Sequence, residues 1–276
     1  MANPNLRLRG SGDDRCVKAL TSAEIENLDA YQLFAALGKR VVHPGGRKST
    51  EELFAMAAIE PHHHVLEIGC GNGTTAVTIV ERFGARVTAV DIDPMMLERA
   101  RATVAQHRLE DRVTLEQMDV RALGFPDETF DRVVIEAVTM FVEHQAAARE
   151  AVRVCKPGGM VLDHEFIWRK PPTPGIRHGF QVEVCPMEFE TADMWEGVYR
   201  RAGLEDVQIT IGTFGLITPQ GFLRDEGLAN TLMIGAHCLR RWAFIKKTAW
   251  NLKRIVPAAP YLGYVVIAGT KPSPNG

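Results

Sequence analysis

A glycine-rich segment is the part of the chain best suited to bind a ligand through its backbone. The run Glu67–Gly73 has glycine at positions 69, 71 and 73. Glycine permits a tight turn and a close approach of the ligand, and a helix that follows offers unpaired N–H groups. Thr74 stands where a dinucleotide-binding turn has its third glycine. The spacing therefore departs from a pyrophosphate cradle.

Two aspartates complete this set of residues. Asp91 ends a predicted strand about 20 residues after the turn, where a carboxylate can accept hydrogen bonds from both ribose hydroxyls. Asp119 ends the next predicted strand and could accept a hydrogen bond from an adenine amino group. Because the ends of parallel strands meet in one crevice, we expect all three features to lie together. A glycine turn with two acids favours a cationic nucleoside without phosphates.

Alternating strand and helix patterns between residues 63 and 165 must position these groups. Mostly apolar runs predict strands at His64–Ile68, Arg86–Asp91, Val113–Met118, Phe130–Ile135 and Met160–Asp163. Helical patterns cover Thr74–Phe83, Pro94–His107 and 143–154, and later strands are predicted at 207–211 and 261–269. Buried strands joined by helices indicate an α/β fold. We expect a doubly wound, mostly parallel seven-stranded sheet with helical cap insertions.

Six successive segments are predicted. They are an N-terminal arm and helix (1–48), a ligand-binding core (49–165), a cap loop (166–190), a core continuation (191–217), a helical cap insertion (218–256), and a last strand and tail (257–276). Thr21 with Glu24 and Ser49 with Glu52 have the spacing of capping boxes, which open helices. The first of these helices is expected to end at Gly38.

The insertion at 218–256 contains a helix with two distinct rows of side chains. Trp242, Ile245, Ala249 and Leu252 recur at helical spacing, and Arg240, Lys247 and Arg254 fall seven apart on another face. One interpretation is a lid helix with an apolar inner face and a solvated basic one. The alternative is a surface that meets a membrane or an anionic group of the substrate.

Four motifs in order resemble those of class I S-adenosylmethionine-dependent methyltransferases. They are Glu67-x-Gly69-x-Gly71-x-Gly73, Asp91-Ile92-Asp93, Phe130-Asp131 and Arg153-Val154-Cys155-Lys156-Pro157-Gly158-Gly159. The pattern is most similar to the small-molecule branch that includes ubiquinone/menaquinone-methylase-like enzymes, and it covers about residues 50–165. Cys155, where the family often has leucine, and Met140-Phe141, where many members have a polar pair ending in histidine, depart from it.

The resemblance implies S-adenosyl-L-methionine as cofactor and a small molecule as methyl acceptor. It places the cofactor against residues from each strand end: Glu67, Gly69, Cys70, Gly71, Asn72, Gly73, Asp91, Ile92, Met96, Asp119, Val120, Glu136 and Ala137. The glycine turn would contact the methionine part, and Asp91 would hold the ribose. Glu136 and Ala137 would line the site near the methyl group.

Methyl transfer needs little acid–base chemistry from the protein. Holding the nucleophile in line with the methyl group contributes on the order of 7–11 kcal/mol. A general base adds about 10²–10⁴-fold, and only when the nucleophile arrives protonated. The candidate bases are His164 and Glu165, which follow the fifth predicted strand, and His43 in the His43–Gly46 loop.

Two other functions remain compatible with these residues. A nicotinamide-dependent oxidoreductase can share the sheet, although the missing third glycine and the Lys-Pro-Gly-Gly turn argue against it. The chain could also be a non-catalytic module that binds S-adenosylmethionine.

The composition limits the partners and the cellular location that we expect for the protein. A formal charge of −2 is unlike the strongly basic domains that bind nucleic acid. No apolar run reaches the roughly 18–20 residues that span a bilayer, so we expect no transmembrane segment and at most peripheral membrane contact. Five scattered cysteines form no C-x-x-C pair, which favours a reduced, cytoplasmic protein. Consecutive side chains at His62–His64 point to alternate faces, and no metal site is expected.

Overall fold

The computed structural model describes residues 20–185, 187 and 189–273, and these divide between two compact units. Of the described residues, the sheet unit comprises 48–166, 190–211 and 265–273, and the helical unit comprises 20–47, 167–185, 187, 189 and 212–264. The segments predicted as arm and caps fall mostly in the helical unit. Of the N-terminal arm, residues 1–19 lie outside the described residues.

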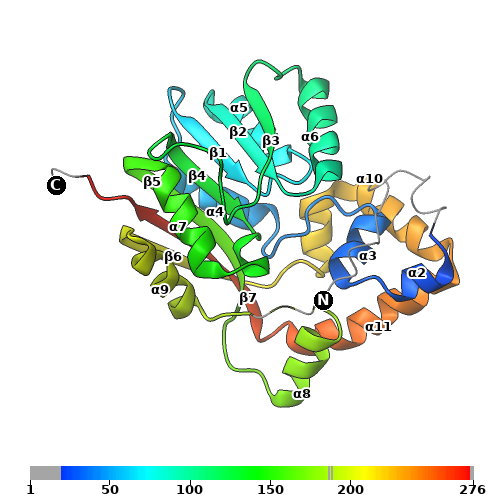
Figure 1. The fold of residues 1–276 in the computed structure, drawn as a ribbon. Coiled ribbons are helices and arrows are strands. Elements are labelled where there is room, and N and C mark those ends of the chain that lie inside the picture. Colours follow the sequence, from blue (N-terminus) through cyan, green and yellow to red (C-terminus); the bar gives the residue numbers. More distant parts are fainter. Residues whose placement is uncertain (1–19, 186, 188, 274–276) are drawn as a thin grey trace. The chain divides into compact units, whose positions relative to one another are not determined.

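A seven-stranded sheet in the order β3-β2-β1-β4-β5-β7-β6 confirms the predicted fold class (Figure 1). Its strands are β1 His64–Ile68, β2 Arg86–Asp91, β3 Val113–Gln117, β4 Phe130–Glu136, β5 Cys155–Trp168, β6 Glu205–Thr213 and β7 Leu262–Thr270. Strands β1 to β5 pair in parallel. Backbone bonds join Gly158 to Lys271 at one end and Arg169 to Tyr261 at the other, so β7 runs antiparallel to β5.

The register aligns the carboxyl ends of the central strands. Ile68, the last residue of β1, stands opposite Val90 of β2 and Ile135 of β4. The residues that follow these three in the sequence are Gly69, Asp91 and Glu136, which therefore lie at one edge of the sheet. This alignment brings together the glycine turn and Asp91, two of the three features that the sequence placed in one crevice.

Helices on the two faces of the sheet hold this register. α5 (Thr74–Phe83) packs on α6 (Pro94–His107), and α7 (His144–Val154) packs on α9 (Ala192–Ala202). Right-handed crossovers place these two pairs on opposite faces. Asp93 is the N-cap of α6, and its Oδ1 accepts a hydrogen bond from Met95 N–H at 2.8 Å. Pro94 follows at the first helical position, where no backbone N–H is needed for a hydrogen bond within the helix.

Several predicted boundaries were wrong. Strand β5 extends beyond Met160–Asp163 at both ends. Lys271, which follows β7, exchanges backbone bonds with Gly158 and Gly159 and draws the predicted turn into the strand, and Arg169 bonds to Tyr261 beyond the other end. His164 and Glu165 therefore lie inside β5 and do not follow it. The helix α4 is Arg47–Ala57, so Ser49 is a buried helix residue and not a cap.

The helical unit contains α2 (Ser22–Glu26), α3 (Ala30–Leu37), α8 (Pro174–Arg177), the π-helix η2 (His178–Val182), α10 (Pro219–Leu239) and α11 (Trp242–Ala258). Two helices stand where one was predicted before Gly38, because Thr21 and Asp29 each form a capping box. The core of the unit joins side chains from α3, α10 and α11, among them Leu33, Ile234 and Phe244.

Buried charges hold the loop before α4 to α10. Helix α10 is kinked at Gly227, where φ is +72°. Just before the kink, Glu226 pairs with Lys39 at 3.2 Å, and both side chains are fully buried. Glu226 also accepts bonds from Arg40 N–H and Val41 N–H, and the neighbouring Asp225 accepts one from Arg47 N–H at 3.1 Å. These carboxylates fix the loop that contains His43.

The apolar inner face predicted for the second helix of the insertion was also wrong. Trp242, Ala249 and Leu252 are exposed, whereas α11 buries Ala243, Phe244, Asn251, Ile255 and Ala258. Both rows follow helical spacing, so periodicity alone could not choose between them. Within the described residues, no helix combines the length and hydropathy that crossing a membrane requires.

Candidate functional site

The glycine turn at the end of β1 is fixed by backbone hydrogen bonds. Gly69 N–H and Cys70 N–H both donate to the Val90 carbonyl, at 2.8 and 3.0 Å, and Gly73 N–H donates to the Cys70 carbonyl. Gly69, Gly71 and Gly73 all have positive φ, which other residues adopt only at a cost. Cys70 is buried, and Asn72 Oδ1 accepts bonds from Thr74 N–H and Oγ1 at the start of α5.

Two of these glycines are needed for different reasons. A Cβ atom on Gly69 would lie 2.1 Å from Cγ2 of Val138, so the neighbouring loop leaves no room there. A Cβ atom on Gly71 would have no neighbour within 4 Å. The space beside Gly71 is therefore open to a ligand.

Asp91 joins the turn to the second strand. Its carboxylate accepts hydrogen bonds from Gly71 N–H at 2.8 Å and from Asp93 N–H at 2.9 Å. Burial raises the pKa of Asp91, and these backbone donors oppose the rise. Ile92 beside it is 61% exposed, an unusual state for isoleucine, and Met96 on α6 is half-buried. An aspartate beside an exposed apolar side chain suits a ribose and a flat base.

Asp119 stands two residues beyond β3 and not at its end. Its carboxylate accepts hydrogen bonds from the backbone N–H of Arg121 and from Nε and Nη2 of the same residue. These bonds lower the pKa of Asp119. Val120 next to it is buried. The predicted adenine acceptor is thus an ionised, partly paired group.

Glu136 ends β4 and is held by two hydroxyl groups. Thr75 Oγ1 donates to its Oε1 at 2.9 Å, and Thr50 Oγ1 donates to its Oε2 at 2.7 Å. The adjoining Ala137 has φ of +56°, and its N–H donates to the carbonyl of His164 at 2.7 Å. Sequence reasoning missed both threonines, because nothing in a helical threonine's local pattern distinguishes a distant carboxylate partner.

Negative charge accumulates at this edge of the sheet. Glu67 is fully enclosed at the end of β1, and its Oε2 has no hydrogen-bond partner in the described structure. Burial raises the pKa of Glu67 well above its usual range, and the charges of Glu136 and Asp91 raise it further. The charges of Asp91 and Glu136 thus both act on Glu67, and no Lys or Arg contributes to this shift of its pKa. A cationic ligand would relieve their repulsion.

The candidate bases in β5 are both buried. His164 is fully buried, with Nδ1 3.9 Å from Oε2 of Glu136. Glu165 Oε1 accepts bonds from Val138 N–H and Met140 N–H, at 3.1 and 3.3 Å, and thereby holds the loop that follows β4. Glu165 has a raised pKa through burial first and the charge of Asp163 second.

Asp163 and Tyr199 extend this buried set. The Tyr199 hydroxyl donates to Asp163 Oδ2, and burial raises the pKa of Asp163 to about 6. Sequence reasoning missed both residues: the partners are 36 positions apart, and neither belongs to a recognisable motif.

The other histidines considered in the sequence analysis, His43 and His62–His64, occupy different places. His43 is half-buried in the helical unit, with Nδ1 3.4 Å from the carbonyl of Pro44. His62 and His63 bring one ligand atom each within 4.8 Å of one from Glu60, so two of the three consecutive histidines do converge. His64, the first residue of β1, turns elsewhere, with Nε2 2.9 Å from Thr88 Oγ1. His62 and His63 precede the strand, so the alternation predicted for these two side chains was wrong. Burial lowers the pKa of His64 to about 4.

Comparisons with known proteins agree with this geometry. A family model described as a methyltransferase domain matches residues 65–159. An uncharacterized protein of Haemophilus influenzae is 32% identical over 211 residues, which is 74% of this chain and 83% of that protein. The 27-O-demethylrifamycin SV methyltransferase of Amycolatopsis mediterranei is 31% identical over 160 residues, covering 56% of this chain and 59% of the relative.

The chain belongs to the class I S-adenosylmethionine-dependent methyltransferases. Among solved structures, phosphoethanolamine N-methyltransferase 2 of Haemonchus contortus, in complex with phosphomonomethylethanolamine and S-adenosylhomocysteine, shares the fold of this methyltransferase. Its TM-score is 0.69 at 19% sequence identity, over 92% of this chain and 58% of that one.

The strand ends of this methyltransferase fit its cofactor, S-adenosyl-L-methionine. The open space beside Gly71 would admit a ligand against the backbone. The unpartnered Oε2 of Glu67 and the carboxylate of Glu136 suit the positive charges of a sulfonium and an ammonium group. The same acids would repel a pyrophosphate, which disfavours a dinucleotide.

Proposed function

We propose that this methyltransferase transfers a methyl group to a small-molecule acceptor by in-line displacement, mainly through positioning and desolvation. The observation that carries the proposal is the convergence of Glu67, Asp91 and Glu136 on a positive-φ glycine turn. Such an edge selects a cation and excludes phosphate. Positioning can account for about 7–11 kcal/mol of the barrier.

The cofactor roles are assigned by position along the strand ends. Gly69, Cys70, Gly71, Asn72 and Gly73 would contact the methionine part, together with Glu67. Asp91 would hold the ribose, and Ile92 and Met96 would face the adenine. Asp119 and Val120 would meet the adenine edge, and Glu136 and Ala137 would lie near the methyl group.

When bound, the cofactor supplies an electrophilic methyl group on a sulfonium. The chain's own residues orient the ligand and exclude water. Glu165 holds the loop after β4 through two backbone N–H groups, and the Thr50 and Thr75 hydroxyls fix the Glu136 carboxylate. His43, His164 and Glu165 stay candidate bases for an acceptor that arrives protonated.

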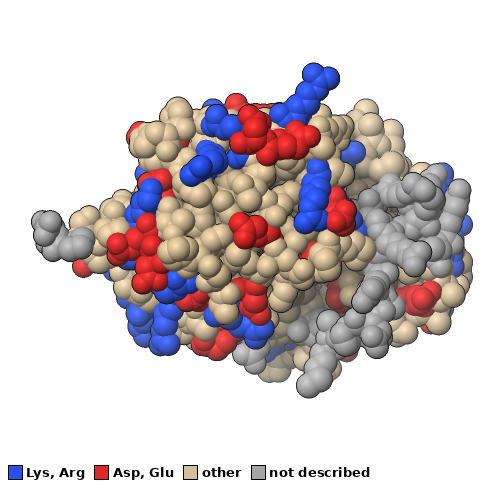
Figure 2. Space-filling view, turned by 45° about the horizontal axis from the view of Figure 1, so that its top comes forward, with Lys and Arg blue, Asp and Glu red and all other residues tan. Residues whose placement is uncertain are grey.

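A small acceptor is supported by the named relatives. One is named for a rifamycin, and one structural neighbour was solved with phosphomonomethylethanolamine. Figure 2 shows Lys/Arg and Asp/Glu interspersed over the face that it presents, unlike the continuous basic stripe that a nucleic acid requires. Membership of the ubiquinone/menaquinone-methylase-like branch rests on the motifs alone. The cytoplasmic location and the cap role of 166–190 and 218–256 stay predictions.

Calorimetry with S-adenosylmethionine tests the cofactor site. We expect wild-type binding, a loss of at least roughly 100-fold in affinity for Asp91→Ala, which removes the ribose acceptors, and an undetectable signal for Gly71→Val, whose side chain would fill the open space. Circular dichroism verifies that both variants stay folded. Exposed Asp111→Ala on the loop before β3 is the matched control. Unchanged binding in both site variants would overturn the assignment.

The candidate bases are tested by the pH profile of methyl transfer. Once an acceptor is found with labelled cofactor, His43→Ala, His164→Ala and Glu165→Gln are compared over pH 5–9. A general base produces one limb of the pH–rate profile. Its replacement should remove that limb and lower kcat by about 10²–10⁴-fold. A variant that keeps the wild-type limb and rate excludes that residue as the base.

A further inference from the structure

The C-terminal part of the chain has a strongly asymmetric charge. Residues 227–276 contain seven Lys and Arg and no Asp or Glu, whereas the rest of the chain contains 25 basic and 34 acidic residues. Six of the seven cations fall between Arg240 and Arg254. The nearly neutral total charge therefore conceals a basic tract of +7. Charge separation of this kind points to an anionic partner.

Helix α11 presents apolar and basic side chains together on its outward face. Its outward row is Trp242, Lys246, Ala249, Lys253 and Val256, at spacings of four, three, four and three residues, with Leu252 beside it. Trp242 is 71% exposed and Val256 is 57% exposed. Large apolar side chains with this exposure on one helix face mark a contact surface.

The cations on the flanks of α11 have intramolecular duties. Lys247 Nζ donates to the Glu26 carbonyl at 2.9 Å and lies over the Trp250 ring. Arg254 pairs with Glu183 and stacks on the same ring at 3.8 Å. In the outward row, Lys246 approaches the exposed Glu26 at 3.6 Å, and Lys253 has no ion pair within the described part of the chain. The two outward lysines therefore have only one exposed ion pair between them, and they are less engaged within the chain than Lys247 and Arg254.

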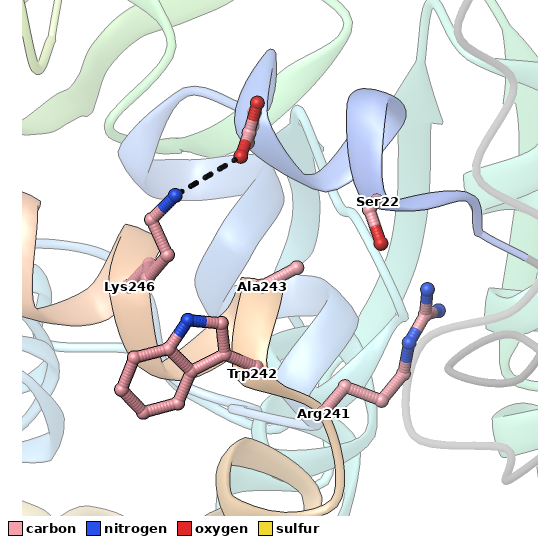
Figure 3. A pocket seen from close by; sticks show the side chains of 6 residues that line it. Ser22, Arg241, Trp242, Ala243 and Lys246 are labelled. Atoms are coloured by element: carbon pink, nitrogen blue, oxygen red, sulfur yellow. Dashed lines mark ion pairs between the residues drawn. The ribbon is translucent and has the colours of Figure 1, made fainter.

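The surface is hollowed at the start of α11. A pocket of about 340 Å³ opens there. It is lined by Trp242, Lys246, Arg241, Ala243, Ser22 and Glu26 (Figure 3). In this view the Trp242 ring lies below Lys246, whose dashed ion pair runs to the Glu26 carboxylate. An indole beside ammonium and guanidinium groups matches the boundary between lipid headgroups and acyl chains, where tryptophan is enriched.

We propose that the outward row of α11, Trp242, Lys246, Ala249, Leu252, Lys253 and Val256, docks on the surface of an anionic lipid bilayer. The apolar side chains would enter the interface, and the two lysines would contact lipid phosphates. Helices that bind in this way combine an apolar row containing Trp or Leu with Lys or Arg. Each lysine near such a surface contributes about fivefold in partition, from roughly 1 kcal/mol.

The mixed row distinguishes a bilayer from nucleic acid. A phosphate backbone is bound by cations and needs no exposed indole or valine between them. In the outward row, by contrast, Trp242, Ala249 and Val256 alternate with Lys246 and Lys253. A bilayer satisfies both kinds of side chain at once.

Vesicle co-sedimentation tests the surface with the full chain. The probes are vesicles of phosphatidylcholine alone and with 40% phosphatidylglycerol. We expect binding to the anionic vesicles only, weakened in 0.5 M NaCl. Lys246→Glu/Lys253→Glu should lower partition by at least roughly 30-fold, the combined effect of two lysines. The matched control is Lys48→Glu/Arg101→Glu, whose side chains are exposed by 58% and 51% against 58% for Lys246. The control should bind like wild type.

Tryptophan fluorescence tests whether the apolar side chains enter the bilayer. Trp168 and Trp195 are buried and Trp250 is half-buried, so Trp242 is the exposed reporter. We expect a blue shift with anionic vesicles and quenching by brominated acyl chains, both lost in Trp242→Phe. Trp242→Ser/Val256→Ser should weaken partition at least fivefold, whereas Met194→Ser/Ile211→Ser, with 52% and 50% exposure in the sheet unit, should not.

Three results would overturn the proposal. One is equal loss in the charge control, which would show a non-specific effect of net charge. Another is tight binding to a DNA duplex with none to anionic vesicles. The third is concentration-dependent self-association, abolished by Trp242→Ser, in a protein that ignores vesicles. Cofactor binding by calorimetry is measured on every variant, so failure of this proposal and failure of the proposed function are separate outcomes.

Discussion

The two units bury acidic groups in opposite ways. In the helical unit, Glu226 is matched by Lys39, and Asp225 is matched by Arg224 at 2.8 Å. In the sheet unit, Glu67 is buried near two other carboxylates that raise its pKa. A buried acid paired with a cation maintains structure, whereas a buried acid whose pKa is raised by neighbouring carboxylates is a state that a cationic ligand improves. The contrast locates the site without reference to motifs.

The largest expected effect comes from breaking the buried pair in the helical unit. Glu226→Ala leaves the Lys39 ammonium buried without its partner, and Arg40 N–H and Val41 N–H lose their acceptor. We expect the free energy of unfolding to fall by about 3–5 kcal/mol. Urea titration followed by circular dichroism measures it.

A double variant separates charge from packing at the same place. Lys39→Met/Glu226→Leu removes both charges, and we expect it to recover most of the lost stability, because an apolar pair has no desolvation cost. If the double variant were no more stable than Glu226→Ala, the loss of stability would come mainly from the backbone N–H groups that Glu226 holds. A loss below 1 kcal/mol in Glu226→Ala would contradict the contrast between the units.

Two glycines in the sheet unit give the next effect and sharpen the ligand side of the comparison. Gly69→Ala combines a left-handed φ, costing about 1–2 kcal/mol, with a Cβ 2.1 Å from Val138, costing about 1–3 kcal/mol. We expect a loss of about 2–5 kcal/mol in stability. Gly71→Ala bears only the φ cost, so its stability falls by about 1–2 kcal/mol while its cofactor affinity drops at least tenfold. Equal stability losses would refute this division.

The buried acids of β5 predict a pH dependence of stability. Asp163 has a pKa of about 6 in the folded protein, against about 3.9 for an ordinary aspartate. The folded state therefore holds a proton that the unfolded state releases between these values. This contribution to stability is complete below pH 4 and is lost as the pH rises through 6, with a slope of up to about 1.4 kcal/mol per pH unit.

Asp163→Asn isolates this contribution from other titrating groups. His64, whose pKa is lowered to about 4, acts in the opposite sense, because its contribution is present above pH 6.5 and is lost toward pH 4. The difference in unfolding free energy between Asp163→Asn and wild type should therefore rise from pH 4 to 6. Parallel curves in that range would contradict the raised pKa of Asp163.

The sequence allowed the sheet unit to be predicted in detail because its determinants are local. Apolar runs, the glycine turn and the proline at the start of α6 set element type within a few residues, and α6 and β2 match their predicted bounds. Strand ends then follow from parallel pairing, which placed Asp91 and Glu136 correctly at one edge. The length of β5 was missed because it depends on pairing with Lys271, more than 100 residues away.

The helical unit was less predictable because its determinants are long-range. Neither the periodicity of α10 nor that of α11 shows that Glu226 meets Lys39 or which row of α11 faces outward. An apolar row is ordinarily assigned to the interior. The row that is buried contains the amide of Asn251, which argues against assigning it there. Its members are Ala243, Phe244, Asn251, Ile255 and Ala258. At the site, the same limit hid the Thr50 and Thr75 donors.

The smallest expected effect comes from an exposed pair in the sheet unit. Arg121 and Asp119 form a charge-assisted contact like that of Lys39 and Glu226, but their side chains are 52% and 30% exposed. Water already solvates both groups, so Arg121→Ala should change the free energy of unfolding by less than about 1 kcal/mol. Removing a cation beside the proposed adenine acceptor should raise affinity for the cationic cofactor by no more than about threefold, and 0.5 M salt should erase the gain. If Arg121→Ala destabilised the protein as much as Glu226→Ala, then burial would not be what separates the two pairs.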